Sequence, residues 1–487
     1  MEGTAELVGQ VGDAFWTWVM VPVVVVTAAY LTVRTGVVQL RWFPEMLRVV
    51  RDRAPRDEHG RPHSLSAFQA FSLSAASRVG VGNIAGVGTA IAVGGPGAIL
   101  WMWLMAFLVG ASSLVESALA QLFKVRDHAG FRGGPAYYIE RGLGRRGAAV
   151  LFAVILILCF PFAFNSLQAN TLAQTVVGAA GEDRAPGWLP AVVGLVVAVL
   201  TALVILGGVR RIAKVAQSAI PVVAVVYLLV GLVVVAMHAE ALPGAAASVV
   251  TEAWGATQVA GATLGTIIMT GVRRGMFSNE AGLGSVPNAA ATAAVSHPVK
   301  QGLVQTLGVY FDTWLVCSIT AAIILVTGPD LTDAPRGVHL AQTAMAETLG
   351  DWSGVLLTVI IFLLAFTSIL GNYYYGESNL RFITAHPRAL DVFRALTVLV
   401  AFAGCVAGAD LVWNLADALM GVMALINLVA VLLLSRTGFA LVRDYARQRR
   451  AGRDPVFTRD RLPGVSGVTC WADHDDVVGH TPARVGG

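Results

Sequence analysis

The chain has 487 residues, of which 56% are hydrophobic and 13% are charged, and its formal net charge is +4. A soluble protein of this size needs a far larger charged surface, so the composition excludes the ordinary soluble classes and indicates a protein embedded in a lipid bilayer. The small net charge says little about soluble partners, and we infer neither a nucleic acid nor an obligatory protein partner from it.

Apolar runs of about 20 residues recur along nearly the whole chain, and each can cross the roughly 30 Å of hydrocarbon in a bilayer. We therefore predict an all-α membrane protein with about 11 transmembrane helices. Their expected bounds are residues 15–36, 65–94, 98–123, 147–178, 187–207, 212–237, 259–295, 301–328, 343–376, 389–408 and 411–435. The first twelve residues contain no Lys or Arg, so we expect no secretory signal peptide.

Basic residues in short loops predict the orientation, because they favour the cytoplasmic side. The loop after the first span contains Arg41, Arg48, Arg51, Arg53, Arg56 and Arg61, and we place it inside. The basic segments 124–146, 210–214, 381–388 and 443–453 and the region of Lys300 then also lie inside, whereas the loops 181–187, 240–252 and 329–337 lie outside. The sequence thus predicts a multi-pass plasma-membrane protein with its N-terminus outside and its C-terminus in the cytoplasm.

Two of the predicted spans carry glycines and polar side chains at their middle. Residues 75–90 read AASRVGVGNIAGVGTA, and residues 271–290 read GVRRGMFSNEAGLGSVPNAA. Five spans separate the two stretches, so the second crosses the bilayer in the opposite direction to the first. Interrupted spans at matching places in two inverted halves are typical of secondary transporters with discontinuous helices. We therefore predict a five-plus-five inverted repeat.

The repeat divides the chain into five segments. Residues 1–64 hold the outer N-terminus, a peripheral first transmembrane helix and a cytoplasmic amphipathic link. Residues 65–238 form the first repeat, 239–258 an extracellular connection, and 259–436 the second repeat. Residues 437–487 form a cytoplasmic tail, whose mixture of Arg, Asp and Gly is typical of disorder.

Glycine lowers the cost of unwinding a helix and lets a ligand approach the backbone. We expect unwinding at Gly80 and Gly82 in the first stretch, and at Gly271, Gly275, Gly282 and Gly284 in the second. The outer half of the first broken helix, from about Ile84, would direct its positive end at the break and hold a carboxylate. The carbonyls at the end of the inner half would hold a cation. An amino-acid zwitterion and a sodium ion fit such a gap.

Close packing of helices is the alternative explanation of these glycines, because small residues four apart often serve only that purpose. Packing leaves several polar residues of the two stretches unexplained, since a buried polar group in lipid costs several kcal/mol unless it is paired. These residues are Arg78, Asn83, Arg273, Arg274, Asn279 and Glu280.

Five blocks of sequence are distinctive. They are GVGNIAGVGTAIAVGGPGAILWMWLMAFLVG (80–110), GGPAYYIERGLG (133–144), RRGMFSNEAGLGSVPNAAATAAVSHPVKQGLVQ (273–305), TSILGNYYYGE (367–377) and WNLADALMGVMALINL (413–428). Together they resemble the alanine/glycine:cation symporter family, also called sodium:alanine symporters, over roughly residues 15–440. The resemblance implies a LeuT-like fold and uptake of alanine or glycine that is driven by Na⁺, or by H⁺ in some members.

The resemblance also implies a sodium site between the first broken helix and the ninth span. The expected ligands are the backbone carbonyls of Ala76, Val79 and Leu364 and the hydroxyls of Thr367 and Ser368. Five oxygens without a carboxylate suit Na⁺ better than a divalent ion. Judged without the resemblance, a Thr-Ser pair in a membrane helix more often bonds the carbonyls of its own preceding turn.

The substrate site that the resemblance implies is built from both broken helices and their neighbours. Its expected residues are Gly80, Val81, Gly82, Asn83, Gln168, Gly275, Phe277 and Asn372. Gln168 and nearby Asn165 could instead form an interhelical hydrogen bond, and Phe277 could be an ordinary core aromatic. The family usually has Thr where this chain has Val81, and an aromatic residue, often Trp, where it has Asn372. Losing the hydroxyl would remove a substrate or ion contact, and Asn372 would admit a larger or more polar side chain, so both departures count against strict alanine/glycine selectivity.

Four further acids lie in or at the ends of predicted spans, namely Glu116, Asp312, Glu377 and Asp417. We expect them to pair with Arg78, Arg273 or Arg274, because intramembrane arginines need partners. A proton relay or an ion site is the alternative role.

These observations predict a secondary active symporter, not an enzyme, that imports a small neutral amino acid with Na⁺ by alternating access. An H⁺-coupled or broader-specificity amino-acid transporter is the alternative. A channel would show a pore-lining ring from several subunits, and a membrane enzyme a convergent cluster of His, Cys or carboxylates; the sequence suggests neither.

Overall fold

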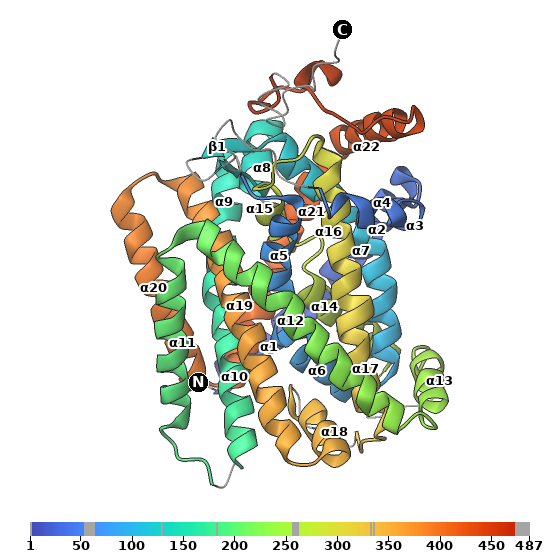
Figure 1. The fold of residues 1–487 in the computed structure, drawn as a ribbon, viewed down its shortest axis with the longest axis vertical. Helices are drawn as coiled ribbons and strands as arrows, with labels where there is room; N and C mark the ends of the chain where they lie inside the picture. Colours follow the sequence, from blue (N-terminus) through green and yellow to red (C-terminus); the bar gives the residue numbers. More distant parts are fainter. Residues whose placement is uncertain are drawn as a thin grey trace.

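A computed structural model describes residues 2–52, 64–127, 130–181, 184–255, 263–331, 334 and 337–472, with side chains from Gly9 onward. Long helices, packed side by side, dominate it (Figure 1). Among the described residues, eight helices are long and apolar enough to cross a membrane, or nine if the bent pair α5–α6 counts as one span.

The helices of the first half begin with α1 (Glu2–Phe15), η1 (Trp16–Met20) and α2 (Val21–Thr35), which form one span, followed by the short α3 (Val38–Arg41) and α4 (Phe43–Val49). The first predicted repeat contains α5 (Ala67–Arg78), η2 (Val81–Asn83), α6 (Ala85–Gly94), α7 (Gly97–Leu122), α8 (Pro135–Leu143), α9 (Arg146–Ile157), η3 (Leu158–Phe164), α10 (Asn165–Ala180), α11 (Leu189–Ile205) and α12 (Gly208–Met237). A small antiparallel hairpin, β1 (Val125–Asp127) and β2 (Gly130–Arg132), pairs Arg126 with Phe131.

The second half follows after α13 (Leu242–Glu252). It contains α14 (Leu264–Asn279), α15 (Pro287–Ala290), α16 (Pro298–Val309), η5 (Tyr310–Cys317), α17 (Ser318–Val326), α18 (His339–Leu349), α19 (Trp352–Ile383), α20 (Pro387–Val406), α21 (Ala409–Leu433), α22 (Ser435–Arg450) and η6 (Arg459–Arg461). The eight long spans, the bent pair and the shorter α11 and α14 correspond in order to the eleven predicted spans.

Two predicted spans differ from the structure. The span expected at 343–376 is two helices, because α18 ends at Gly350, whose φ of +87° is incompatible with a continuing helix, and α19 starts two residues later. The span expected at 259–295 is helical only as α14 and the four-residue α15, with residues 280–286 between them outside any helix.

The basic loops gather at one end of the molecule. In Figure 1 the hairpin, α4, α8 and α22 lie at the top, whereas α13 and α18 lie at the bottom. This arrangement matches the predicted alternation of loops along the chain. Which end faces the cytoplasm remains a prediction.

The two interrupted helices run in opposite directions. From α5 to α6 the chain descends in Figure 1, and from α14 to α15 it ascends. The interruption between α5 and α6 lies near mid-height, and the end of α14 lies beside it, since Asn83 Nδ2 donates to the Ser278 hydroxyl at 3.1 Å.

The tail was predicted to be disordered, and the structure contradicts this for residues 437–472. Phe457 and Trp471 are fully buried, and Trp471 Nε1 donates to the carbonyl of Gln121 at 3.1 Å. The Ser296 hydroxyl donates to the carbonyl of Pro455 at 2.8 Å. A few aromatic side chains anchor the segment, although its average composition is polar. Residues 473–487 lie outside the described residues.

Candidate substrate and ion site

The first break is where the sequence places it. Helix α5 ends at Arg78, α6 begins at Ala85, and the two are bent by 62°. The amide of Gly80 donates to Asn83 Oδ1 at 3.0 Å, and the amide of Val81 donates to Gln168 Oε1 at 3.0 Å. These side chains satisfy amides that unwinding releases, which a bilayer interior requires.

Two glycines let neighbouring side chains reach this backbone. A Cβ at Gly80 would lie 2.5 Å from Ser368 Oγ, and one at Gly82 would lie 2.7 Å from Phe277 Cε1. Both distances are shorter than side chains tolerate, so α14 and α19 touch the break only because these positions lack a side chain.

Two glycines of the second stretch do not unwind it, contrary to the prediction. Helix α14 continues through Gly271 and Gly275. A Cβ at Gly271 would lie 2.6 Å from the carbonyl oxygen of Ala98, and one at Gly275 would lie 3.4 Å from Met102 Cα. Gly271 therefore permits close packing of α14 on α7, which is the alternative that the spacing left open, whereas a Cβ at Gly275 would make an ordinary contact.

The second break begins at Glu280 instead. This residue caps α14 with a φ of 55°, a left-handed conformation that is uncommon for a residue other than glycine. Gly282 and Gly284 follow with φ of 81° and 82°, so these two glycines lie in the break as predicted.

A cluster of neutral hydrogen-bond donors surrounds a buried acid beside the first break. Asn83 Nδ2 donates to Asp312 Oδ1 at 2.6 Å, and the Ser278 hydroxyl donates to Asp312 Oδ2 at 2.7 Å. Asp312 lies in η5, a π-helical segment, a geometry that is frequent at functional sites. We did not predict a role for Ser278, although a hydroxyl next to Phe277 in an interrupted span was an available signal.

The two hydroxyls predicted to bind sodium behave differently. Ser368 Oγ reaches across to the carbonyl of Ser77 at 2.6 Å, beside Ala76 and Val79 at the end of α5. Thr367 Oγ1 instead donates within its own helix, to the carbonyls of Leu363 at 2.8 Å and Leu364 at 3.1 Å. Ser368 therefore lies at the contact between α5 and α19, and the binding of sodium by the five predicted ligand residues stays a prediction.

Asn372 joins the same region from α19. Its Oδ1 lies 2.6 Å from the Ser77 hydroxyl, and its Nδ2 donates to Asn165 Oδ1 at 2.9 Å. The predicted substrate residues other than Gly275 thus surround the two breaks.

Aromatic rings separate this region from a large cavity. The ring of Phe277 lies 4.8 Å from that of Phe164 and 5.5 Å from that of Trp413, measured between centroids. The guanidinium of Arg274 lies 4.9 Å above the Trp413 ring and pairs with Asp417. The rings and the ion pair form a lid over the break.

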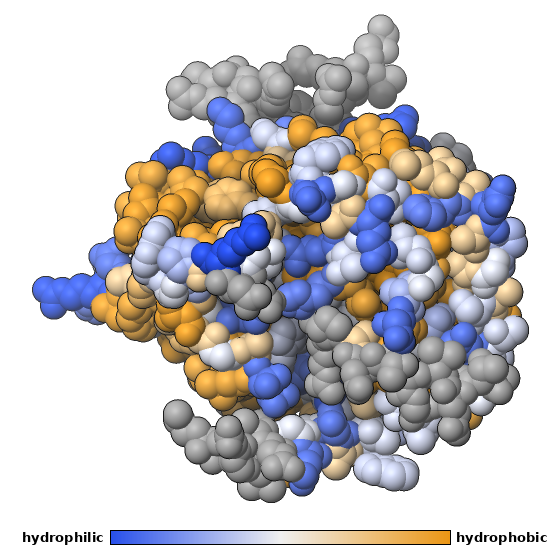
Figure 2. Space-filling model, turned by 90° about the horizontal axis from the view of Figure 1, so that it is seen from below, coloured by the Kyte–Doolittle hydropathy of each residue, from blue (hydrophilic) through white to orange (hydrophobic). Residues whose placement is uncertain are grey.

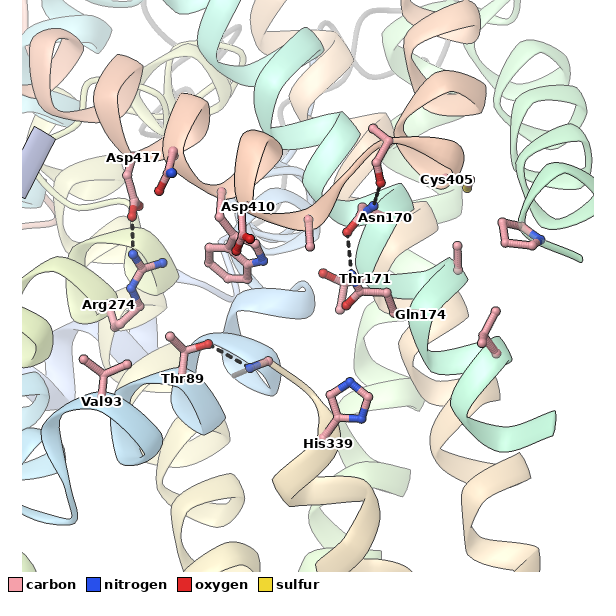
Figure 3. A pocket seen from close by; sticks show the side chains of 18 of the residues that line it. Thr89, Val93, Asn170, Thr171, Gln174, Arg274, His339, Cys405, Asp410 and Asp417 are labelled. Carbon is pink, nitrogen blue, oxygen red and sulfur yellow. Dashed lines mark hydrogen bonds and ion pairs between the residues drawn. The ribbon is translucent and has the colours of Figure 1, made fainter. Parts of the chain in front are cut away.

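The cavity has a volume of about 710 Å³ and reaches the end of the molecule that carries α13 and α18. Figure 3 shows Thr89, Asn170, Gln174, His339 and Asp410 around it, with the Arg274–Asp417 pair at the left of the view. Seen from this end, hydrophilic side chains gather in the middle of the face, and hydrophobic side chains dominate its left and upper parts (Figure 2). The site is therefore approached through a polar vestibule.

The arginine pairing is confirmed for Asp417 alone. Its Oδ2 pairs with Arg274 and lies 3.6 Å from Arg273, which also pairs with Asp13 at 2.8 Å. Glu377 pairs with Arg381 on the next turn of its own helix, at 3.0 Å.

The prediction is wrong for the acids near the breaks. Glu116 accepts from the Gly282 amide at 3.0 Å and from Asn427 Nδ2 at 2.7 Å, and Asp312 has the neutral partners given above. Arg78 donates to the carbonyl of Gln305 at 3.0 Å. Helix rotation decides these partners, and linear spacing does not show it.

A mid-membrane break between two oppositely directed helices, reached through a vestibule, defines a secondary transporter. The fold is similar to that of the transporter MhsT, solved in complex with L-phenylalanine, with a TM-score of 0.56 at 12% identity. That match covers 80% of this chain and 99% of the other, so the chain has a LeuT-like fold.

The family follows from sequence. The model of the sodium:alanine symporter family matches residues 1–459, and the chain belongs to this family. It is a multi-span membrane transporter and not an enzyme.

Relatives align over nearly their full length. A probable sodium/glutamine symporter of Bacillus subtilis, GlnT, is 45% identical over 470 residues, which cover 96% of each chain. The sodium/alanine symporter AgcS of Methanococcus maripaludis is 38% identical over 439 residues, which cover 88% of this chain and 94% of AgcS. A putative sodium/proton-dependent alanine carrier of B. subtilis, YrbD, is 38% identical over 483 residues, which cover 96% and 97%.

Proposed function

We propose that the protein imports a neutral amino acid together with Na⁺ by alternating access. The observation that carries this proposal is the break at residues 79–84, whose two helix ends face each other with opposite partial charge. The carbonyl end of α5 and Ser368 supply oxygens for a cation, and the amino end of α6 faces the place for a carboxylate.

We assign the substrate to the space beside Gly80–Asn83, Gln168 and Phe277. Alanine and glycine fit a site that the Phe277 ring covers closely, because overpacking excludes larger side chains. Asn372 adds a polar group to this region, so a polar neutral amino acid such as glutamine is a second candidate. Two relatives are named for these two kinds of substrate: AgcS is a sodium/alanine symporter, and GlnT is a probable sodium/glutamine symporter.

The transport of Na⁺ and of substrate is coupled because both bind in the same break between α5 and α6. Each Na⁺ that enters with the substrate contributes free energy to the uptake. This is the free energy of its concentration gradient plus about 2.3 kcal/mol per 100 mV of membrane potential. Since ion and substrate bind between the same helix ends, each is expected to tighten the binding of the other by an equal factor.

Uptake into proteoliposomes tests the proposal. Radiolabelled alanine, glycine and glutamine are supplied with an inward Na⁺ gradient, with a proton gradient, or with neither. We expect accumulation of at least one of the three under the Na⁺ gradient. Equal uptake under all three conditions would exclude coupling.

The sodium site has its own test. The double variant Thr367→Val and Ser368→Ala should raise the Na⁺ concentration for half-maximal uptake severalfold, because it removes two proposed oxygen ligands. Thr358→Val is the matched control, since Thr358 lies on the same helix and donates only to its own Gly354 carbonyl at 2.7 Å. An unchanged Na⁺ dependence in the double variant would remove this site from the proposal.

A further inference from the structure

We propose that the groove between α11 and α20 binds one anionic phospholipid, with an acyl chain in the groove and the phosphate in a basic pocket at its end. Such a lipid site is additional to the proposed amino-acid symport, and it can be detected without any transport. The lining, length and charge of two adjoining hollows support it.

The groove lies at the edge of the molecule, where α11 and α20 lie side by side at the left of Figure 1. It has a volume of about 530 Å³. Three alanines line it, Ala198, Ala202 and Ala395, so short side chains leave the hollow between the helices. Leu195 and Leu399 also line it and are 58% and 59% exposed. An apolar groove that is open along its length suits a hydrocarbon chain.

The groove has about the length of one leaflet. On α20 its lining runs from Asp391 to Phe402, eleven positions further along, which corresponds to about 16 Å of α-helix. Half of the hydrocarbon core of a bilayer is about 15 Å. The helices touch at the far end, where a Cβ at Gly194 would lie 3.0 Å from the carbonyl oxygen of Phe402. An acyl chain that enters beside Asp391 therefore fits in extended form.

A basic pocket of about 300 Å³ adjoins the groove at this entrance, and Asp391 and Arg394 line both hollows. Arg381 of α19 and His386, which caps α20, line the pocket as well. Arg381 pairs with Glu377 through Nε at 3.0 Å, and Arg394 pairs with Asp391 through Nη1 at 3.3 Å. Each guanidinium has five N–H groups, so both can also donate to a phosphate. The headgroup of a lipid in the groove would thus meet two arginines from different helices.

The charges of this region favour a monoanion. Arg381, Arg394 and the exposed Arg388 in the first turn of α20 contribute three positive charges, and Glu377 and Asp391 contribute two negative ones. One positive charge remains. A phosphodiester has one negative charge, and its oxygens match the planar donors of a guanidinium.

The sign and the place of this charge select among membrane lipids. A zwitterionic headgroup brings a cation of its own and leaves the positive charge of the pocket unbalanced. Basic pockets between transmembrane helices at the cytoplasmic side bind acidic headgroups in other membrane proteins. The pocket lies at the end of α20 that the loop charges predict to be cytoplasmic. We therefore assign the groove and the pocket to an acidic phospholipid.

Native mass spectrometry tests this site by counting bound lipids. The protein is reconstituted into vesicles with equal amounts of phosphatidylglycerol and phosphatidylcholine and is then extracted in a mild detergent. Wild type should retain phosphatidylglycerol roughly tenfold more often than phosphatidylcholine. Arg381→Gln combined with Arg394→Gln should lower the retained phosphatidylglycerol roughly tenfold. The matched control is Arg145→Gln combined with Arg443→Gln, which removes two exposed arginines at the same end of the molecule and should retain lipid like wild type.

A second pair of variants tests the acyl chain separately from the headgroup. Ala202→Phe fills the groove and leaves every arginine in place, so it should also lower the retained phosphatidylglycerol roughly tenfold. Val199→Phe is its control, because Val199 is an exposed residue of α11 that does not line the groove. This control should retain as much phosphatidylglycerol as wild type.

Three results would overturn the proposal. They are equal retention of the two lipids by wild type, wild-type retention of phosphatidylglycerol by the folded arginine variant, and wild-type retention by Ala202→Phe. Arg394 Nε also donates to Tyr373 Oη at 3.2 Å, so the arginine variant could fail to fold. In that case the comparison of Ala202→Phe with Val199→Phe decides. No readout here requires uptake, so a failure of the proposed symport would leave these results unchanged.

Discussion

At Gly82 the backbone of the first break lies against the ring of Phe277. The same ring contacts Phe164 and Trp413, so one aromatic side chain touches both the break and the lid. A small change at this glycine is therefore expected to move the lid without touching any hydrogen bond of the site.

Gly82→Ala tests this contact. A new Cβ would lie 2.7 Å from Phe277 Cε1, so the ring must move away, and we expect uptake to fall by roughly tenfold to a hundredfold. Gly147→Ala is the control, because a Cβ at this exposed position of α9 meets nothing within 4 Å. Initial uptake rates of both variants, normalised to folded protein, are compared with wild type. Wild-type uptake in Gly82→Ala would contradict the assignment of Phe277 to the substrate region.

At the scale of elements, α22 is held against the start of α16 by a buried histidine. His297 Nδ1 accepts from the Val299 amide at 3.2 Å, so the ring hydrogen lies on Nε2, 3.3 Å from Asp444 Oδ2. Burial lowers the pKa of His297 below its usual 6.5, although the Asp444 carboxylate opposes this shift. Burial thus favours the neutral form of this histidine in the folded protein.

This arrangement predicts that stability decreases in mild acid. Because the unfolded chain binds a proton at His297 more readily than the folded one, stability is lost as the pH falls below about 6.5. Thermal unfolding should therefore occur at lower temperature at about pH 5.5 than at about pH 7.5, and His297→Gln should weaken this dependence.

His386→Gln is the control for the pH experiment. His386 caps α20 in the same way, with Nδ1 accepting from the Arg388 amide at 3.2 Å, but it is exposed. Its replacement should leave the wild-type pH dependence intact. The same dependence in His297→Gln as in wild type would show that other groups cause it.

For the whole molecule, the vestibule and the packed tail lie at opposite ends. The cavity reaches the end with α18, whereas α22 and residues 451–472 cover the other end. The cavity thus leads from one end of the molecule to the lid over the proposed site, and alternating access predicts that this lid opens during the transport cycle.

Cysteine labelling tests both the access to this cavity and the orientation. Cys405 lines the cavity, so it is first replaced by Ser. In intact cells, a membrane-impermeant thiol reagent should label Asp410→Cys, in the vestibule, and should leave Asp454→Cys, at the tail end, unlabelled. Both positions are exposed, so accessibility within the protein does not bias the comparison. The reverse pattern would invert the predicted orientation.

Hydropathy and glycine placement predicted the spans and the first break. An apolar run in hydrocarbon has few options besides a helix, because its backbone must bond to itself. A backbone that leaves the helix there needs polar side chains close by, and Asn83 supplies one next to Gly80.

The second break could not be located in the same way. Gly275 and Gly282 have the same chemistry, but the first packs against Met102 of α7 and the second has a φ of 81°. Glycine suits either use, and only the neighbouring helix decides between them.

By itself, the sequence determined that this chain spans a membrane and that it is interrupted twice, because these follow from local hydrophobicity and backbone hydrogen bonding. Only the tertiary structure decided which buried acids meet arginines, where α14 ends, and that Trp471 anchors the tail. Those outcomes depend on the rotation and approach of helices distant in sequence, and local pattern contains no information about either.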